Sequence, residues 1–351
     1  MKGKTKELIT SLVERYPEAE PKDLFKFLFQ SAFGCEHLVE SEQSARNYIE
    51  IEYLRGEENA LPLLDELDGD YVRLNLRVLD MGLTTATLTK LFTLSARTEE
   101  EGRARLIAKL NTVEEMLDAG QLPFERAAYQ AALREWQDRG YPPVRHSESF
   151  HRAYHPSYRV ISASFAQYIS LLIELDRRLQ KGPLTLAVEG GSASGKTTLS
   201  SLLEKIYGAR SVHMDDFFLR PEQRTPERLA EIGGNVDRER FIAEALPGLL
   251  SRGTVTYRPF DCSLRALSDP IVLEPRPLTV VEGVYSTHPE IEKYYDLSVL
   301  LDIPEDLQKQ RVEKRNPDLS HRFLSEWIPM ENAYFSATDI HSRTDLILKI
   351  K

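Results

Sequence analysis

The stretch GGSASGKTT contains residue types that can hold a phosphate group. Gly190, Gly195, Lys196 and Thr197 fit the pattern G-x-x-x-x-G-K-[ST]. Glycine permits such a loop because it has no Cβ atom and tolerates positive φ, so the backbone can wrap closely around a phosphate. Successive N–H groups then point inward, at the positive end of the following helix. The pattern therefore predicts a phosphate-binding loop, or P-loop.

The side chains of this loop have distinct expected roles. Lys196 would reach the β and γ phosphates of ATP, and the Thr197 hydroxyl would bind Mg²⁺. The residues expected to bind the nucleotide are Gly190, Gly191, Ser192, Ala193, Ser194, Gly195, Lys196, Thr197 and Thr198.

Strand and helix signals flank the loop on its two sides. Leu184–Glu189 is a short apolar run typical of a buried strand, and apolar residues recur at helical spacing from Leu199 to Ile206. Gly208 is a typical helix end. A chance match in a flexible loop would lack this context, so the strand-loop-helix order supports the phosphate-binding interpretation.

Other short patterns narrow the class of P-loop protein. The Asn316–Asp318 stretch is not a guanine-recognition motif, and no transporter signature of the L-S-G-G-Q kind occurs. The run TVVEG (279–283) ends in Glu-Gly rather than in the Asp-Glu of motor ATPases. A carboxylate at the end of a buried strand needs a partner, so we expect Glu282 to lie near Mg²⁺.

Five motifs, in their order, resemble the uridine kinase and phosphoribulokinase group. They are GGSASGKTT, HMDDFF (213–218), NVD (235–237), RPFD (258–261) and VVEG (280–283). The resemblance covers about residues 184–351, and GGSASGKTT is its most specific part. Members of the group phosphorylate a hydroxyl of a small metabolite with ATP. The resemblance therefore implies ATP and Mg²⁺ as cofactors and a small-molecule alcohol as acceptor.

The resemblance implies that Asp215 is the general base. A carboxylate at this sheet edge can accept the hydroxyl proton of the acceptor as its oxygen attacks the γ-phosphorus. Asp216 is an adjacent alternative, and it could instead bind the substrate or assist Mg²⁺ through water. An Asp-Asp pair after a strand is also typical of a helix N-cap.

Four more residues are assigned to the acceptor site by the same resemblance. Asp237 matches the position that holds ribose hydroxyls in the family, and a solvated surface acid is the alternative. Asp261 matches the aspartate of a tyrosine-aspartate pair, with Phe260 in place of the tyrosine. In uridine kinases a histidine that helps to hold the base follows this pair in the sequence. The stretch FDCSLRAL contains no such histidine. Arg265 could therefore hold an anionic acceptor such as a sugar phosphate, or lie on the surface.

The stretch RVEKRNPDLSHR (311–322) resembles the arginine-bearing lid of the family. Arg311 and Arg315 are four residues apart and share one helix face, and both are assigned to catalysis. Arg322 follows on a loop and is assigned to nucleotide binding. Guanidinium groups that close over the γ-phosphate would offset charge in the transition state and exclude water. A solvated helix face is the alternative for such a charge run.

Composition limits the kinds of partner. A net charge of −10 argues against nucleic acid, because phosphate-backbone affinity needs a basic surface. No apolar stretch of about 18 residues and no signal-peptide pattern is present, so no membrane partner is expected. Cys35 and Cys262 make no disulfide framework, which favours a reducing compartment. The chain is therefore expected to be cytoplasmic.

The residue pattern changes at Gly182-Pro183. Residues 1–181 read as a helical domain of unknown role, although alternation in DYVRLNLRVLDMG leaves strand and helix both open there. Residues 182–351 alternate helical stretches with the apolar runs LTLAVE, SVHMD, LTVVEG, LSVLLDI and LILKI. The predicted fold class is α/β: a P-loop NTPase with a parallel five-stranded sheet covered by helices, preceded by an all-α N-terminal domain.

The helical half contains no motif of known activity. The phenylalanine-rich stripe at 24–33 is typical of a core. His146, His151 and His155 are an incomplete metal-ligand set, because Pro156 argues against a continuous helix and no cysteine joins them. This half could dimerise, cover the acceptor site or bind a regulator.

The chain is therefore predicted to be an ATP-dependent kinase acting on a hydroxyl of a nucleoside or related sugar-containing metabolite. Pantothenate, ribulose phosphate and nicotinamide riboside are other acceptors that the sequence leaves open. The alternative from a different class is a nucleotide-binding regulatory or scaffolding protein that has no small-molecule acceptor. The sequence also leaves open whether the chain forms a homo-oligomer.

Overall fold

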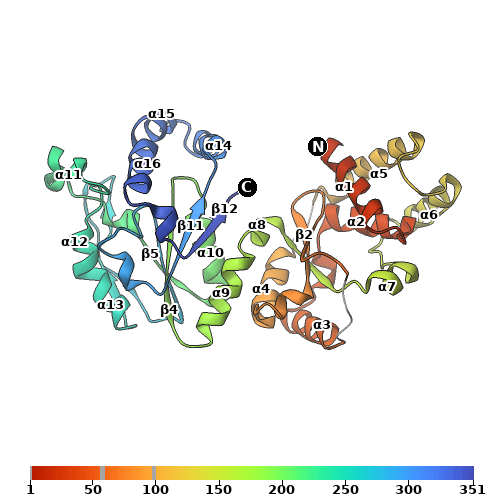
Figure 1. The fold of residues 1–351 in the computed structure, drawn as a ribbon, viewed down its shortest axis with the longest axis horizontal. Helices are drawn as coiled ribbons and strands as arrows, with labels where there is room; N and C mark the ends of the chain where they lie inside the picture. The colour runs from red at the N-terminus through yellow and green to blue at the C-terminus, as the bar shows by residue number, and fades with distance from the viewer. Residues whose placement is uncertain (1, 56–59, 97–99) are drawn as a thin grey trace. The chain divides into compact units, whose positions relative to one another are not determined.

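The computed structural model describes residues 2–55, 60–96 and 100–351 (Figure 1). Contacts divide the chain into two compact units, Met1–Ile173 and Glu174–Lys351. The division falls within helix α9 (Ile169–Leu179), whereas the sequence places the boundary after that helix, at residue 182. Within the described residues, no helix combines the length and the apolar character needed to cross a membrane.

A parallel five-stranded sheet forms the centre of the C-terminal unit. Its strands are β4 (Leu184–Gly190), β5 (Arg210–His213), β10 (Leu278–Glu282), β11 (Leu297–Asp302) and β12 (Leu346–Lys349). Their order across the sheet is β12-β11-β4-β10-β5, and every neighbouring pair is parallel. Strands β4 and β10 are buried at every position, as expected for strands covered on both faces. The predicted five-stranded P-loop NTPase sheet is therefore confirmed.

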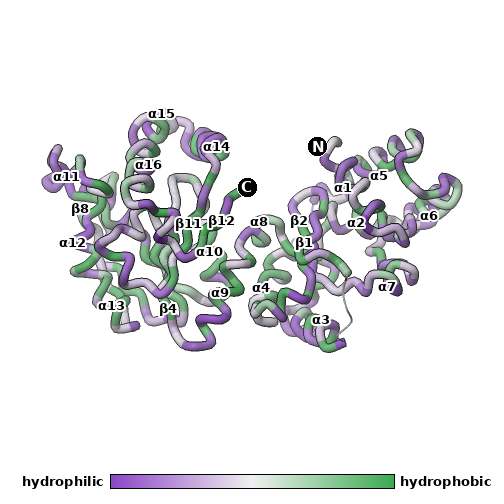
Figure 2. Tube along the Cα trace, viewed as in Figure 1, coloured by the Kyte–Doolittle hydropathy of each residue, from purple (hydrophilic) through white to green (hydrophobic). Residues whose placement is uncertain are grey.

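Helices and short strand pairs surround this sheet. The helices are α10 (Lys196–Tyr207), α11 (Pro226–Ala230), α12 (Arg238–Arg240), α13 (Leu246–Leu250), α14 (Glu305–Arg315), α15 (Ser320–Arg322), α16 (Ile328–Ala337) and α17 (Ile340–Arg343), and the short turns include η3 (Met214–Phe217). Strand β6 (Val255–Tyr257) pairs with β9 (Ile271–Leu273), and β7 (Phe260–Asp261) pairs with β8 (Ala266–Leu267). Helix α14 is hydrophilic over most of its length (Figure 2), and only its Gln308 and Val312 are buried.

The N-terminal unit is mainly helical, but the expectation of an all-α domain is wrong. Its helices are α1 (Lys2–Arg15), α2 (Pro21–Phe33), α3 (Glu42–Leu54), α4 (Thr85–Ser95), α5 (Gly102–Asp118), α6 (Arg126–Asp138), α7 (Glu148–Tyr154) and α8 (Ala163–Ala166), and its 3₁₀ turns include η2 (Leu76–Leu79). An antiparallel sheet of β1 (Leu64–Glu66), β2 (Tyr71–Asn75) and β3 (Tyr158–Ser162) lies among them.

Strand β2 explains why the sheet was missed. All five of its residues are buried, among them Arg73 and Asn75, so the strand has no solvent-facing side to mark its period. Its partner β3 lies far along the chain, with Tyr71 opposite Ser162. Pairing between such distant segments leaves no local signal in the sequence.

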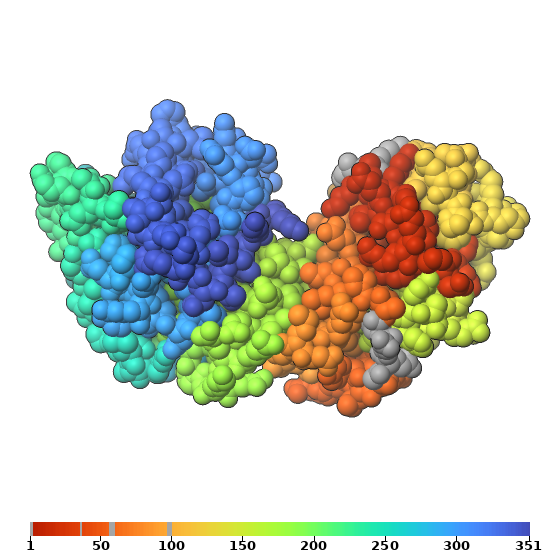
Figure 3. Space-filling view, in the orientation of Figure 1, coloured from red at the N-terminus to blue at the C-terminus, as the bar shows by residue number. Residues whose placement is uncertain are grey.

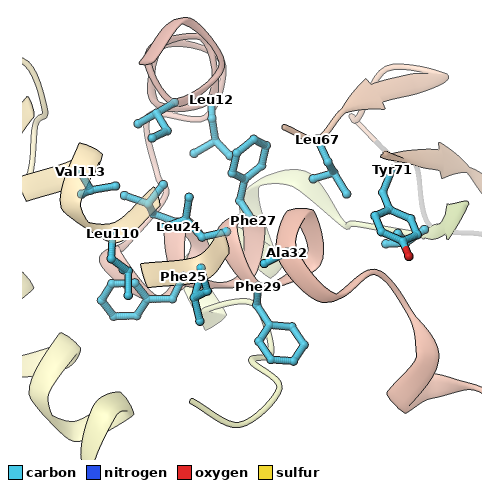
Figure 4. Packing of buried hydrophobic residues seen from close by; sticks show 14 of the residues in the cluster. Leu12, Leu24, Phe25, Phe27, Phe29, Ala32, Leu67, Tyr71, Leu110 and Val113 are labelled. Atoms are coloured by element: carbon cyan, nitrogen blue, oxygen red, sulfur yellow. The ribbon is translucent and has the colours of Figure 1, made fainter. Parts of the chain in front are cut away.

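The phenylalanine-rich helix α2 contributes to the core of this unit, as its pattern predicts (Figure 4). Leu24, Phe25 and Phe27 are each at most 2% exposed. The ring of Phe25 stacks on Trp136 of α6 with 4.9 Å between ring centroids. Leu110 of α5 belongs to the same buried cluster. Helix α2 is therefore held by apolar packing, and this leaves its few polar residues for other roles.

Candidate active site

The predicted P-loop forms a tight turn between β4 and α10. Gly190 has a φ of 153° and Gly195 a φ of 103°, in the region that favours glycine. A Cβ atom at Gly190 would lie 2.7 Å from Ser194 Oγ and 2.9 Å from the carbonyl oxygen of Leu301, so glycine is required there. Helix α10 begins at Lys196, and its first N–H groups are therefore available to an anion held by the loop.

Polar side chains of the loop have the chemistry to receive phosphate oxygens. Lys196 lies against the loop, where its Nζ donates to the carbonyl oxygens of Gly190 at 2.8 Å and Gly191 at 3.0 Å. Ser194 is 1% exposed, and its Oγ has no hydrogen-bond partner among the described residues. A buried hydroxyl without a partner is unusual, and an anion bound in the loop would satisfy it.

A chain of hydrogen bonds links Thr197, Glu282 and His213 at the carboxyl edge of the sheet. Thr197 Oγ1 donates to Glu282 Oε1 at 3.2 Å, and the same oxygen lies 2.7 Å from His213 Nδ1. The register of β5 and β10 places the glutamate and the histidine opposite each other. Burial is the largest single influence on Glu282 and opposes its ionisation. The hydrogen bond and charge of His213, the charge of Lys196 and the hydrogen bond from Thr197 together outweigh burial and lower the carboxyl pKa. The hydrogen bond to Glu282 raises the pKa of His213.

This set of oxygen donors fits Mg²⁺. The ion prefers hard oxygen ligands and is usually held by one or two side chains together with substrate phosphates. Thr197 supplies a hydroxyl oxygen and Glu282 an ionised carboxylate, and the two are hydrogen-bonded to each other. His213 would orient the carboxylate, a role that the sequence did not suggest. Metal binding by Thr197 and Glu282 stays a prediction.

The two aspartates in η3 have different surroundings. Asp216 Oδ2 accepts a hydrogen bond from Tyr257 OH at 2.8 Å. Asp215 has no hydrogen-bond partner within the described chain. Asp215 is exposed by its surface area, but the groups crowded around its carboxyl partly dehydrate it and raise its pKa. Lys196 opposes that shift, and Glu282 adds to it. The surroundings therefore favour Asp215 over its neighbour as a proton acceptor, a choice that the sequence leaves open.

Asp237 is buried and caps helix α12. One of its oxygens accepts from the Arg240 N–H at 3.0 Å, and the other accepts from Gln223 Nε2 at 2.8 Å. Because only 2% of Asp237 is exposed, the alternative of a solvated surface acid is wrong. Its expected contact with ribose hydroxyls stays a prediction. In such a contact the hydroxyls would compete with Arg240 and Gln223 for the carboxylate oxygens.

Phe260, Asp261 and Arg265 lie on the hairpin of β7 and β8. Asp261 Oδ1 accepts from the N–H groups of Ser263 at 2.7 Å and Leu264 at 3.0 Å, and hydrogen bonding by Ser263 lowers the carboxyl pKa. Arg265 is exposed, has a φ of 54°, and pairs with no acid among the described residues. Asp261 therefore organises the hairpin turn, while substrate contacts by these three residues stay predictions.

The three arginines assigned to a lid occupy different environments. Arg311 donates to the carbonyl oxygen of Ala193 at 3.3 Å, so it braces the P-loop. Arg315 is exposed at the end of α14 and has no partner in the described part of the chain. Arg322 pairs with Glu326 at 3.2 Å. Blue residues of the C-terminal segment lie on the face drawn in Figure 3. A lid role for these arginines stays a prediction.

Two further side chains hold the P-loop, and the sequence did not suggest them. Gln308 of α14 donates from Nε2 to the carbonyl oxygen of Ser192 at 2.9 Å. Glu331 of α16 accepts from the Ser192 N–H at 2.8 Å and from its hydroxyl at 2.5 Å. Burial raises the pKa of Glu331. Both residues lie far from the loop in sequence and belong to no motif, so only the folded chain brings them together.

Glu189 anchors the base of the P-loop and was read from the sequence only as a strand residue. Its carboxylate is fully buried, and burial raises its pKa. It accepts five hydrogen bonds, from the N–H groups of Gly190, Tyr285 and Thr287 and from the hydroxyls of Thr287 and Tyr334, at 3.0–3.2 Å. The residue therefore ties β4, the segment after β10 and helix α16 together beneath the loop.

Comparison with known proteins relates about half of the chain to uridine kinases. A uridine kinase of Geobacillus sp. (strain WCH70) is 25% identical over 177 residues, covering 45% of this chain and 82% of that protein. A uridine kinase of Anoxybacillus flavithermus (strain DSM 21510 / WK1) is 24% identical over 179 residues, covering 46% and 83%. A solved structure described as a possible uridine kinase from Bacillus stearothermophilus is 21% identical, with a TM-score of 0.38, and covers 51% of this chain and 99% of its own. No family model matches the chain.

The sequence similarity supports a kinase of the P-loop class. The P-loop lies in the C-terminal unit, which takes up about half of the chain, and the matched share is of the same size. The resemblance to uridine kinases that the motifs indicate is therefore confirmed at the level of a uridine kinase-like P-loop kinase domain. The acceptor is a separate question, because it depends on side chains that vary among such kinases.

Proposed function

We propose that the protein is an ATP- and Mg²⁺-dependent kinase that transfers the γ-phosphate to a hydroxyl group of a small metabolite. One observation carries the proposal: a P-loop lysine, a threonine–carboxylate pair and a carboxylate without a partner belong to one site. They are Lys196, the pair of Thr197 and Glu282, and Asp215. The similarity to uridine kinases supports the same class of reaction.

Each group suits one part of the transfer. Lys196 and the loop amides would bind the polyphosphate and orient its terminal phosphorus. Asp215 would take the proton of the acceptor hydroxyl as that oxygen bonds to the γ-phosphorus and the bond to the ADP oxygen breaks. Its raised pKa makes it a better proton acceptor than an ordinary aspartate. Mg²⁺ held by Thr197 and Glu282 would supply further charge neutralisation for the phosphates.

The proposed lid would complete the site with positive charge. Arg315 is free to approach a phosphate, whereas Arg322 would first have to leave Glu326. Arg311 already braces the loop through Ala193, so its removal would disturb phosphate binding indirectly. Such a lid would exclude water and thereby limit hydrolysis of ATP.

We infer that the acceptor is a nucleoside or a related sugar-containing alcohol. The similarity to uridine kinases supports this class. The resemblance assigns Asp237 to the ribose hydroxyls, and its carboxylate would have to exchange a present donor for a diol. By the family resemblance Phe260 replaces a tyrosine, and the stretch after Asp261 lacks the base-binding histidine of uridine kinases, so we do not tie the acceptor to uridine. An anionic sugar would find the exposed Arg265 available.

An acceptor panel with ADP release as the readout tests the proposal. The full chain is incubated with Mg-ATP and, separately, with uridine, cytidine, pantothenate, ribulose phosphate and nicotinamide riboside. We expect one alcohol to raise the rate of ADP release by at least about tenfold over the rate without acceptor. Without an acceptor, ADP can form only when water attacks the γ-phosphorus, and a bound alcohol is better oriented for that attack. The Lys196→Ala variant serves as the control and should not respond to any alcohol.

Two results would contradict the proposal in different ways. Slow ATP hydrolysis that no alcohol stimulates, on a wide panel, would favour a nucleotide-binding regulatory protein. Absence of affinity for Mg-ATP and Mg-ADP would exclude both functions and would show that the loop does not bind nucleotides.

A further inference from the structure

A large cavity opens within the N-terminal unit, away from the P-loop unit in sequence. Its volume is about 1410 Å³, and its lining includes residues of α2, α3, η2, α7, β3 and the segment 143–146. Segments distant in sequence line this cavity together. Lys26 Nζ of α2, for example, donates to the carbonyl oxygen of Val144 at 3.0 Å. The cavity has room for a metabolite, since typical small-molecule sites measure about 300–1,000 Å³.

The described lining of this cavity is strongly cationic. It contains five lysine and arginine residues but only two acids, Glu52 and Asp80. Both acids already have partners: Glu52 pairs with Arg159 at 2.8 Å, and Asp80 accepts from Tyr53 OH at 2.5 Å. The hydrogen bond from the neutral Tyr53 leaves the charge of Asp80 in place, so the lysines and arginines of the described wall outnumber its acids five to two.

Three cations are positioned to bind an anion. Arg77 and Arg145 are exposed at the cavity, and within the described part of the chain no hydrogen bond or ion pair involves their guanidinium groups. Lys26 lies deeper and uses one of its three ammonium protons on Val144, which leaves two for a ligand. These cations come from three separate segments, so they surround the space instead of forming a solvated stripe on one helix.

The floor of the cavity holds a buried guanidinium with unused donors. Arg159 is 3% exposed, and its Nε and Nη2 atoms have no hydrogen-bond partner among the described residues. Its guanidinium carbon lies 4.3 Å from the ring centroid of Tyr48 and 5.8 Å from that of Phe92. Tyr48 is 52% exposed, so its ring can move aside without disrupting the core. Unpaired buried donors of this kind are rare and point to an acceptor-bearing ligand.

A buried network fixes the rest of the floor. His146 Nδ1 lies 2.8 Å from Asp23 Oδ1, and its Nε2 lies 2.9 Å from Tyr158 OH. Burial lowers the pKa of His146, so the ring stays neutral and adds no charge of its own. Ser147 Oγ also donates to Asp23, at 2.6 Å. The network therefore holds the wall rigidly, as a pre-formed binding site requires.

We infer that this cavity binds a small organic anion through phosphate or carboxylate oxygens. Lys26, Arg77 and Arg145 would pair with those oxygens, and the rings of Tyr48 and Tyr53 would contact the organic part. Nucleic acid is disfavoured because the chain carries a net charge of −10 and the cations line a concavity. The inference does not depend on the proposed kinase function, because every residue that carries it lies in the N-terminal unit.

Isothermal titration of the full chain tests the inference with two probes, pyrophosphate and citrate, which separate phosphate from carboxylate recognition. All titrations use the Lys196→Ala background, so that the P-loop contributes as little as possible. We expect at least one probe to bind saturably with one site per chain. The double variant Arg77→Gln/Arg145→Gln should weaken that affinity by at least about tenfold, because each lost charged hydrogen bond is expensive.

The matched control is Arg134→Gln on α6, an exposed arginine of the same unit that does not line the cavity. It removes the same charge and should leave the affinity unchanged. The inference is overturned if neither probe binds, if the double variant binds as tightly as its parent, or if Arg134→Gln weakens binding equally. Because Arg77 and Arg145 are exposed, both variants should fold, which the thermal unfolding curve of each will verify.

Discussion

The proposed phosphate cradle of the C-terminal unit and the proposed anion-binding cavity of the N-terminal unit would recognise anions by different means. The cradle is a contiguous stretch, Gly190–Thr197, in which backbone N–H groups and one lysine would bind the phosphates. The cavity gathers side chains from segments as far apart as Lys26 and Arg159. A backbone site needs glycine at fixed spacing and so leaves a motif. A side-chain site needs only that the fold bring cations together.

The comparison also predicts how each site responds to substitution. In the proposed cradle most phosphate contacts would come from the backbone, so only a few side chains, such as Lys196 and the acceptor-side Asp215, should have large effects. In the cavity the charge is spread over several side chains, so each substitution should cost a moderate amount of affinity. The predictions below test this contrast, from the largest expected effect to the smallest.

The largest effect should come from Asp215→Asn. The amide cannot accept the hydroxyl proton, so kcat should fall by about 10²–10⁴-fold, the usual contribution of a general base. The affinity for Mg-ATP should change little, because Asp215 makes no hydrogen bond that holds the loop. Steady-state ADP release with the acceptor found on the panel measures kcat, and titration calorimetry measures the affinity.

Asp216→Asn is the matched control for this prediction. The asparagine keeps an oxygen that can accept from Tyr257 OH, so the variant should retain most of its turnover. Equal losses in the two variants would mean that the pair acts through the structure of η3. A larger loss in Asp216→Asn would transfer the role of base to Asp216.

Lys196→Ala should have the next largest effect, and it should be confined to one unit. Loss of the charged hydrogen bonds to phosphate should weaken Mg-ATP binding by about ten- to a hundredfold. Citrate binding at the cavity should not change, since the cavity has its own cations. Calorimetric titrations of both ligands against the variant and the parent measure the two affinities.

If Lys196→Ala left nucleotide affinity intact, the cradle would have to act without its main cation. If it weakened both ligands equally, the two anion sites could not be treated as separate. Either result would contradict the proposed difference between the P-loop site and the cavity site.

The fold was predictable from the sequence wherever the structural signal is local. The apolar runs around Leu184–Glu189 and Leu278–Glu282 correctly indicated buried parallel strands, because such strands are covered on both faces and need no alternation. Strand β2 was ambiguous, since Arg73 is 1% exposed inside it and pairs with Asp65 and Gln30. A buried, fully engaged arginine looks in the sequence like a surface residue.

The same distinction governs the candidate site. The P-loop residues and Asp215 belong to short motifs, so their positions at the sheet edge followed from the strands that precede them. Gln308 and Glu331 were not predictable, because they reach the loop from helices whose sequences look like ordinary surface. His213 stood in a recognised motif, yet its bond to Glu282 depends on the order of β5 and β10 in the sheet. Sheet order is a non-local property.

The smallest predicted effect is a pH dependence of anion binding at the cavity. Burial lowers the pKa of Lys26 to about 8, with help from the charges of Arg73 and Arg145 and against those of Asp23 and Glu52. The ammonium is therefore charged below about pH 8 and loses its proton as the pH rises through that value. Citrate affinity, measured by calorimetry from pH 7 to pH 9, should fall by about fivefold because one attractive charge is lost.

The neighbouring groups of the cavity make this assignment testable. Burial raises the pKa of Tyr158 to about 12 and lowers the pKa of His146, so neither changes charge between pH 7 and pH 9. The variant Lys26→Met keeps most of the length of the side chain without its charge. It should bind citrate at pH 7 about as weakly as the parent does at pH 9, with little further change. A variant that still lost affinity over this range would show that another group titrates, and Lys26 would then not be one of the cations that hold the anion.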